Sequence, residues 1–163
     1  MNLEITRVNI SNWEKLRDIR LEALKYEPEA FSSSFKEVEL YPDQYWKDMI
    51  LDKNNIILLA LVDGITVGMV RAALKDEDVD ENTAFIGSLY VRDNYRRMGI
   101  GKRLMEEIIS IIWSESRLLN VRLWVNDKQL EAIELYKSIG FIEVGEEIEG
   151  RKREIIFEKR IRL

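Results

Sequence analysis

A short loop with two glycines most constrains what this 163-residue chain can fold into. Residues 96–102 read Arg-Arg-Met-Gly-Ile-Gly-Lys, and they stand between a strand-like run at 83–91 and a long amphipathic segment. Glycines lack the Cβ atoms that would block a close approach, so successive N–H groups can converge on an anion, and a helix start adds its unpaired N–H groups. Arg96, Arg97 and Lys102 surround the loop with positive charge, which suits a diphosphate better than a single carboxylate. The loop therefore predicts a pyrophosphate site.

Two common phosphate-binding motifs do not fit this loop. A dinucleotide fingerprint needs a third glycine where Leu104 stands. A Walker A loop needs a glycine at the position of Arg96 and a serine or threonine at the position of Arg103. The sequence therefore disfavours a Rossmann dinucleotide site and the hydrolysis of nucleoside triphosphates.

The pattern Arg-x-x-Gly-x-Gly between a strand and a helix resembles the acyl-CoA pyrophosphate loop of the GNAT superfamily of N-acetyltransferases. Residues 126–141 are similar to a second signature of that family, in which a helix with Ala-x-x-Leu-Tyr ends in Gly-Phe before the next strand. The two signatures stand here in the family's order and spacing. The resemblance is strong over residues 83–144, loose over 1–73 and weak over the last strands.

The resemblance implies an α/β (α+β) fold in one acetyltransferase domain over residues 1–163. The expected sheet is mixed and mostly antiparallel, with about seven strands, about four flanking helices and a splayed parallel strand pair that binds CoA. The apolar content of 46% suffices for one core at this chain length. Hydrophobic periodicity and turn residues predict strands at 3–8, 55–62, 66–74, 83–91, 118–125, 141–147 and 154–162, and helices at 13–26, 43–51, 99–114 and 129–139. Residues 75–82, with five carboxylates, are expected to form an exposed loop.

The resemblance also implies which residues bind the cofactor. In the family, the strand before the loop has an exposed edge that binds the pantetheine arm as an added strand would. Here that edge is residues 89–91, where Leu89 and Val91 can at the same time be core residues. Asn126 is a candidate for a further contact or for a helix cap or turn residue, because Gln129 stands where relatives carry a CoA-binding asparagine. The residues assigned to acetyl-CoA in this way are Leu89, Tyr90, Val91, Arg96, Arg97, Met98, Gly99, Ile100, Gly101, Lys102 and Asn126.

The resemblance implies that Tyr136 is the general acid that protonates the departing thiolate of CoA. A phenol is protonated at neutral pH and is more acidic than water, so it suits this role. The alternative interpretation is an aromatic core residue on an apolar helix face. Backbone N–H groups of the splayed strand are expected to stabilise negative charge on the acetyl oxygen. The general base stays unassigned, since Gly87 and Ser88 stand where many relatives carry a glutamate.

The residue types that the chain lacks exclude several kinds of site. Without cysteine or histidine it can form no disulfide, no thiolate zinc site, no cysteine nucleophile and no histidine-dependent triad, and we expect no metal cofactor. The formal net charge is −5, and the basic residues gather at 96–103 and 151–162, which argues against general nucleic-acid binding. The first residues do not resemble a signal peptide, and no apolar run could span a membrane. We therefore expect a cytoplasmic protein with neither a nucleic-acid nor a membrane partner.

In the family, the acceptor of the acetyl group enters between the first two helices and the pantetheine-binding edge. That region is residues 30–45 here, where Glu37 and Glu39 could attract an ammonium group or act through water. The aromatic residues that would form a wall there, or belong to the core, are Phe31, Phe35, Tyr41, Tyr45 and Trp46. A small primary amine is the leading acceptor class, ahead of a protein or peptide N-terminus or a lysine. A domain that binds acyl-CoA without turnover is the alternative from a different functional class. The oligomeric state is left open, with a homodimer as one alternative.

Overall fold

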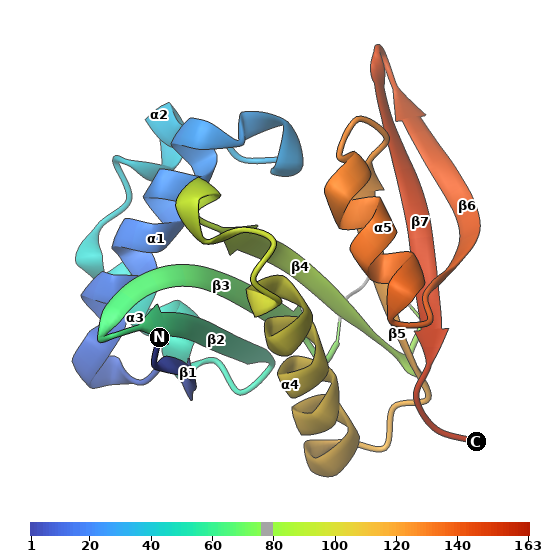
Figure 1. The fold of residues 1–163 in the computed structure, drawn as a ribbon, viewed down its shortest axis with the longest axis horizontal. Coiled ribbons are helices and arrows are strands. Elements are labelled where there is room, and N and C mark those ends of the chain that lie inside the picture. Colours follow the sequence, from blue (N-terminus) through green and yellow to red (C-terminus); the bar gives the residue numbers. More distant parts are fainter. Residues whose placement is uncertain (76–79) are drawn as a thin grey trace.

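The computed structural model describes residues 1–75 and 80–163. A seven-stranded sheet with the strand order β1-β2-β3-β4-β5-β7-β6 forms its centre (Figure 1). Strands β4 and β5 are parallel, and each other pair of neighbours is antiparallel. The strands are β1 (Leu3–Arg7), β2 (Asn55–Val62), β3 (Ile65–Ala73), β4 (Thr83–Val91), β5 (Asn120–Asn126), β6 (Ile142–Glu149) and β7 (Lys152–Arg160).

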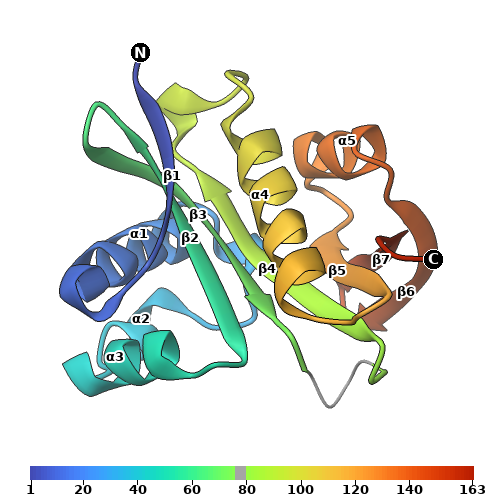
Figure 2. The ribbon, with the colours of Figure 1, turned by 90° about the horizontal axis from the view of Figure 1, so that it is seen from below.

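Helices cover both faces of the sheet. Figure 2 shows α1, α2 and α3 on one side and α4 and α5 on the other. The helices are α1 (Trp13–Tyr26), α2 (Phe35–Val38), α3 (Asp43–Leu51), α4 (Ile100–Glu115) and α5 (Leu130–Ser138). In the described ranges, none of them is long and apolar enough to cross a membrane.

Strand β2 is apolar along almost its whole length because both of its faces are covered. Ile56 and Leu58 belong to the hydrophobic cluster that includes residues of α4 and α5. Ile57 and Leu59 belong to a second cluster, with residues of α1 and α3. Successive side chains of a strand point to opposite faces, so a strand covered on both sides needs no polar alternation.

The elements expected from the sequence are confirmed, with ends that differ by at most two residues. The described part has five helices rather than about four, because α2 was not expected. Ser34 caps α2 by accepting a hydrogen bond from the N–H of Glu37, but a single turn is too short to show helical periodicity. In the acidic loop, Asp80 and Glu81 are exposed as expected, whereas 76–79 lie outside the described residues.

Strands β4 and β5 pair at their first residues and then diverge (Figure 1). Thr83, Ala84 and Phe85 pair with residues 120–122. The structure describes both strands in full, and their remaining residues do not pair with each other. A bulge further distorts β4, because residues 88 and 89 have no partner on β3 and Ser88 has a φ of 57°. The second half of β4 is therefore open on the side that faces β5.

Gly68 allows β3 to lie close to the open end of β4. It pairs with Val91, and a Cβ atom at Gly68 would lie 2.8 Å from the carbonyl oxygen of Tyr90. We expect Gly68→Ala to lower the free energy of unfolding by about 1–3 kcal/mol, because strand backbone would have to move. Urea denaturation measures this, with Gly145→Ala on β6 as the control, since a Cβ there makes only ordinary contact. Equal midpoints for the two variants would contradict the expected effect.

Candidate active site

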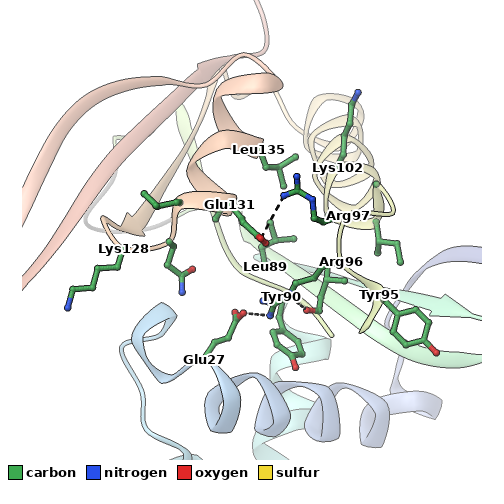
Figure 3. A pocket seen from close by; sticks show the side chains of 17 residues that line it. Glu27, Leu89, Tyr90, Tyr95, Arg96, Arg97, Lys102, Lys128, Glu131 and Leu135 are labelled. Carbon is green, nitrogen blue, oxygen red and sulfur yellow. Dashed lines mark hydrogen bonds and ion pairs between the residues drawn. The ribbon is translucent and has the colours of Figure 1, made fainter. Parts of the chain in front are cut away.

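A cavity of about 650 Å³ lies where β4 and β5 diverge, beside the first turns of α4 and α5 (Figure 3). Nine of the residues assigned to acetyl-CoA from the sequence line it: Leu89, Tyr90, Val91, Arg96, Arg97, Gly99, Ile100, Gly101 and Lys102. The lining residues that the sequence did not assign are Glu27, Tyr95, Lys128, Gln129, Leu130, Glu131, Ala132 and Leu135. Met98, Asn126 and Tyr136 are not among the lining residues.

The loop before α4 has the backbone of an anion-binding nest. Arg97 has a φ of 61° and Gly99 a φ of 80°, and left-handed residues of this kind turn successive N–H groups to one side. Within the described part of the chain, the N–H groups of residues 97–102 donate to no other group, and the first one used is that of Arg103, which donates to the carbonyl of Gly99 at 3.0 Å. Gly101 permits close packing, because a Cβ there would lie 3.3 Å from Leu135 Cδ2. The loop thus offers unpaired donors at the positive end of a 16-residue helix.

Arg96 is held by protein groups rather than extended into the loop. Its Nε donates to the carbonyl oxygen of Val91 at 2.9 Å, and its guanidinium forms an ion pair with Glu27 (Figure 3). Asp93 lies 3.5 Å from the same guanidinium. The position of Arg96 therefore couples the end of β4 to the segment that follows α1.

Arg97 and Lys102 have exposed side chains with weaker partners. Arg97 lies 3.8 Å from Glu131 on α5, and Lys102 lies 3.8 Å from Glu106 one turn further along α4. Exposed ion pairs of this kind contribute little free energy, so both side chains can turn towards a bound anion.

Glu27 is one of the eight lining residues that the sequence did not assign. It follows α1 and precedes Pro28, in a segment without a recognisable motif, and its partner Arg96 lies 69 positions away. Burial raises the pKa of the Glu27 carboxyl, and the charge of Arg96 opposes that shift. Glu27 thereby brings a carboxylate to the α1 side of the cavity.

The edge at residues 89–91 combines packed side chains with an open backbone. Leu89 and Val91 pack against the cluster below α4, as the core interpretation expected. The side chain of Tyr90 points to the other face, where its hydroxyl donates to Glu22 at 3.0 Å. Glu22 also accepts a hydrogen bond from Arg92 at 2.9 Å, so this carboxylate fixes the end of β4 to α1. Burial first, and then the charge of Glu22, raises the pKa of Tyr90.

Tyr136 lies on α5 in the core behind the cavity. Its ring centroid is 5.9 Å from that of Phe141 and 6.4 Å from that of Phe157, and the residue is 7% exposed. Burial raises the pKa of its hydroxyl, and the charge of Glu27 adds to that shift. The hydroxyl therefore stays protonated at neutral pH, and the ring packs in the core as the alternative interpretation expected.

Asn126 and Gln129 lie in the turn between β5 and α5. The Oδ1 atom of Asn126 accepts a hydrogen bond from the N–H of Lys128 at 3.0 Å, which is the turn role considered as an alternative. Gln129, in contrast, lines the cavity. Met98 is 52% exposed and does not line the cavity.

The aromatic residues near α2 and α3 divide into core and surface. Phe31 and Trp46 are buried in the cluster between α1, α3 and the sheet. Tyr41 and Tyr45 pack against each other with ring centroids 4.4 Å apart. The hydroxyl of Tyr41 donates to the exposed Glu37 at 3.1 Å. The expected aromatic wall is thus partly a core structure, and these residues do not line the cavity.

Some curated N-acetyltransferases resemble this chain in sequence. N-alpha-acetyltransferase 50 of Danio rerio is 30% identical over 101 residues, which cover 62% of this chain and 59% of that protein. L-amino acid N-acetyltransferase AaaT of Escherichia coli is 26% identical over 147 residues, which cover 90% of this chain and 83% of that protein. The match to the Danio rerio protein thus spans less than two thirds of its length.

Solved structures and a family model cover most of the chain. The GNAT-family acetyltransferase of Streptococcus pneumoniae has a TM-score of 0.84 at 21% identity, and covers 98% of this chain and 99% of its own. PaiA N-acetyltransferase of Thermoplasma acidophilum, solved with coenzyme A, has a TM-score of 0.78 at 22% identity, with coverages of 99% and 100%. These likenesses confirm the expected fold, and residues 13–141 match the family model described as "Acetyltransferase (GNAT) family". The chain belongs to that family.

Proposed function

We propose that this protein transfers an acetyl group from acetyl-CoA to the amine of a small-molecule acceptor, by direct attack of the amine in a ternary complex. One observation carries the proposal: a single cavity joins the open edge of β4 to the unpaired N–H groups of residues 97–102. A strand edge suits the amide groups of a pantetheine arm, and an N–H nest at a helix start suits a diphosphate. Acetyl-CoA has both groups, and it supplies the activated thioester.

The bulge in β4 would supply the donor for the acetyl oxygen. Since Ser88 and Leu89 have no partner on β3, the N–H of Leu89 can face the cavity rather than the neighbouring strand. A fixed backbone donor stabilises negative charge without reorganising during the reaction.

Tyr136 would act as the general acid. The neutral amine attacks the thioester carbonyl carbon, the carbon–sulfur bond breaks, and the sulfur takes the proton of the Tyr136 hydroxyl. The amine loses a proton to water, from which Tyr136 regains its own. The pKa of Tyr136 is raised, so its hydroxyl carries the proton that this role needs over the whole neutral range.

The names of two relatives support two alternative kinds of amine acceptor. One relative is named an N-alpha-acetyltransferase and the other an L-amino acid N-acetyltransferase. A protein or peptide N-terminus is therefore the second candidate. The exposed carboxylates of Glu37 and Glu39 stay candidates for a water-mediated base.

A thiol-release assay tests the proposed function. The purified protein is incubated with acetyl-CoA and with a panel of amines that contains amino acids, alkylamines, diamines and short peptides. We expect free CoA to appear faster with at least one amine than with water alone. Tight binding of acetyl-CoA without release for any amine would instead indicate a domain that binds acyl-CoA without turnover.

The pH dependence of kcat/KM should follow the acceptor rather than an enzyme side chain. The chain has no histidine, and an ammonium group must lose a proton before it attacks, so the rate should rise as pH rises towards the amine pKa. Because the pKa of Tyr136 is raised above its ordinary value of about 10, loss of the proton donor should not lower the rate below that pH. Two acceptors of different amine pKa check this. A rising limb that stays at the same pH for both would identify an enzyme group, with Glu37 and Glu39 as the first residues to replace.

A further inference from the structure

Arg20 is a partly buried guanidinium on the α1 side of β4. Its Nη1 donates to Ser88 Oγ in the bulge of β4, and its guanidinium lies over the ring of Phe31 at 4.7 Å. The part-buried arginines nearby differ from it, because Arg92 pairs with a carboxylate, and so does Arg96. Among the residues that the structure describes, no carboxylate pairs with Arg20.

The surroundings of Arg20 disfavour an unpaired charge. Burial lowers the pKa of Arg20 to about 10, the charge of Arg71 adds to that shift, and Tyr45 opposes it. The side chain stays charged at neutral pH, so the desolvation cost is present with no acid to offset it. An anion bound beside Arg20 would offset it.

Trp124 provides a second, independent donor. Its Nε1–H is buried and has no hydrogen-bond partner among the described residues. Trp124 stands on β5 two positions beyond Arg122, where the pairing with β4 ends. The neighbouring residues Leu123 and Val125 belong to the cluster below α4, so the Trp124 side chain leaves the sheet on the opposite face, which is the side of α1.

Contacts across β4 connect the two donors. The ring centroid of Trp124 is 5.7 Å from that of Phe85. The Phe85 ring in turn covers Gly87, where a Cβ atom would lie 2.6 Å from Phe85 Cζ. Gly87 precedes Ser88, which accepts the hydrogen bond from Arg20. Arg20 therefore contacts directly the bulge that the proposed reaction uses for the acetyl oxygen, and the Phe85 ring lies between that bulge and Trp124.

We propose that the acceptor carries a carboxylate in addition to its amine, and that Arg20 binds this carboxylate with help from the indole N–H of Trp124. The acceptor class is thus an amino carboxylate, such as a free amino acid. A guanidinium offers paired N–H donors that match the two oxygens of a carboxylate, and buried donors are normally satisfied. Polyamines carry only positive charge, which Arg20 would repel. The inference rests on the proposed acetyl transfer, which makes this face the acceptor side.

Matched acceptors test the inference with the whole protein and acetyl-CoA. The panel contains leucine, phenylalanine and γ-aminobutyrate, the amides leucinamide and phenylalaninamide, the amines 3-methylbutylamine and 2-phenylethylamine, and putrescine. We expect kcat/KM for the best amino carboxylate to exceed that of its matched amide and amine by about tenfold or more, as for a hydrogen-bonded charge pair. Arg20→Gln should reduce that ratio to about threefold or less. Arg17→Gln, on the same helix but paired with Asp18, should leave the ratio unchanged.

A second variant and a binding measurement separate the outcomes. Trp124→Phe keeps an aromatic side chain, although a smaller one, and removes the N–H, so it should lower kcat/KM for the amino carboxylate and not for the matched amine. A best acceptor without a carboxylate, or a ratio that survives Arg20→Gln in a folded protein, would overturn the inference. If no amine is acetylated, the proposed function fails. Calorimetric titration of the same amino carboxylates into the CoA-saturated protein then shows whether the carboxylate site exists. Binding that Arg20→Gln abolishes would support the carboxylate site, and absence of binding would overturn the inference together with the proposed function.

Discussion

Tyr136→Phe should lower kcat by about tenfold to a thousandfold, with little change in the affinity for acetyl-CoA, as expected when a general acid is lost. The ring of Tyr136 packs near Phe141 and Phe157, and phenylalanine keeps that packing. Only the hydroxyl is lost, and burial holds that hydroxyl in its protonated form. Steady-state kinetics with the best acceptor, together with calorimetric titration of acetyl-CoA, measures the two quantities separately.

Tyr26→Phe is the matched control, because Tyr26 is 67% exposed at the end of α1 and lines no part of the cavity. It should keep the full kcat. A Tyr136→Phe protein that also keeps the full kcat would show that solvent or another group protonates the departing thiolate. A fall in affinity for acetyl-CoA without a fall in kcat would assign Tyr136 to packing alone.

The parts of the fold that the sequence predicted are those with a local signal. The helix at 13–26 has periodic apolar residues, Pro28 stands just beyond its end, and Asp63 and Gly64 mark the hairpin between β2 and β3. The loop at 96–102 was predicted because glycines and arginines in that order indicate an anion-binding site. Such signals depend on residues a few positions apart, which a single sequence displays.

The rest depends on contacts between distant residues. Glu22 and Arg92 are 70 positions apart, and Glu27 and Arg96 are 69 apart, so no pattern in the sequence links them. The bulge at Ser88 is equally hidden, since serine is not a residue that predicts a positive φ. Met98, Asn126 and Tyr136 show the limit of the family resemblance, because it suggested all three and none of them lines the cavity. The loop that suits the cofactor was therefore predicted more completely than the acceptor side of the cavity.

Gly99→Val should weaken acetyl-CoA binding by about tenfold or more, which corresponds to about 1.4 kcal/mol or more. Gly99 has a φ of 80° and opens the nest before α4, so a β-branched residue would strain the backbone that aligns the N–H groups and would place methyl groups beside the phosphates. A Cβ at this position meets no protein atom within 4 Å, so the side chain itself has room in the folded protein.

Gly150→Val separates backbone strain from a role in binding. Gly150 has a φ of 61° in the turn between β6 and β7, and a Cβ there also meets nothing within 4 Å. The two variants should therefore lose similar stability in thermal unfolding, because both force valine into the left-handed region. Only Gly99→Val should lose affinity in calorimetric titration with acetyl-CoA, since only Gly99 belongs to the loop with unpaired N–H groups. Equal affinities for acetyl-CoA in the two folded variants would show that the loop is not part of the binding site. The diphosphate would then have to bind elsewhere on the protein.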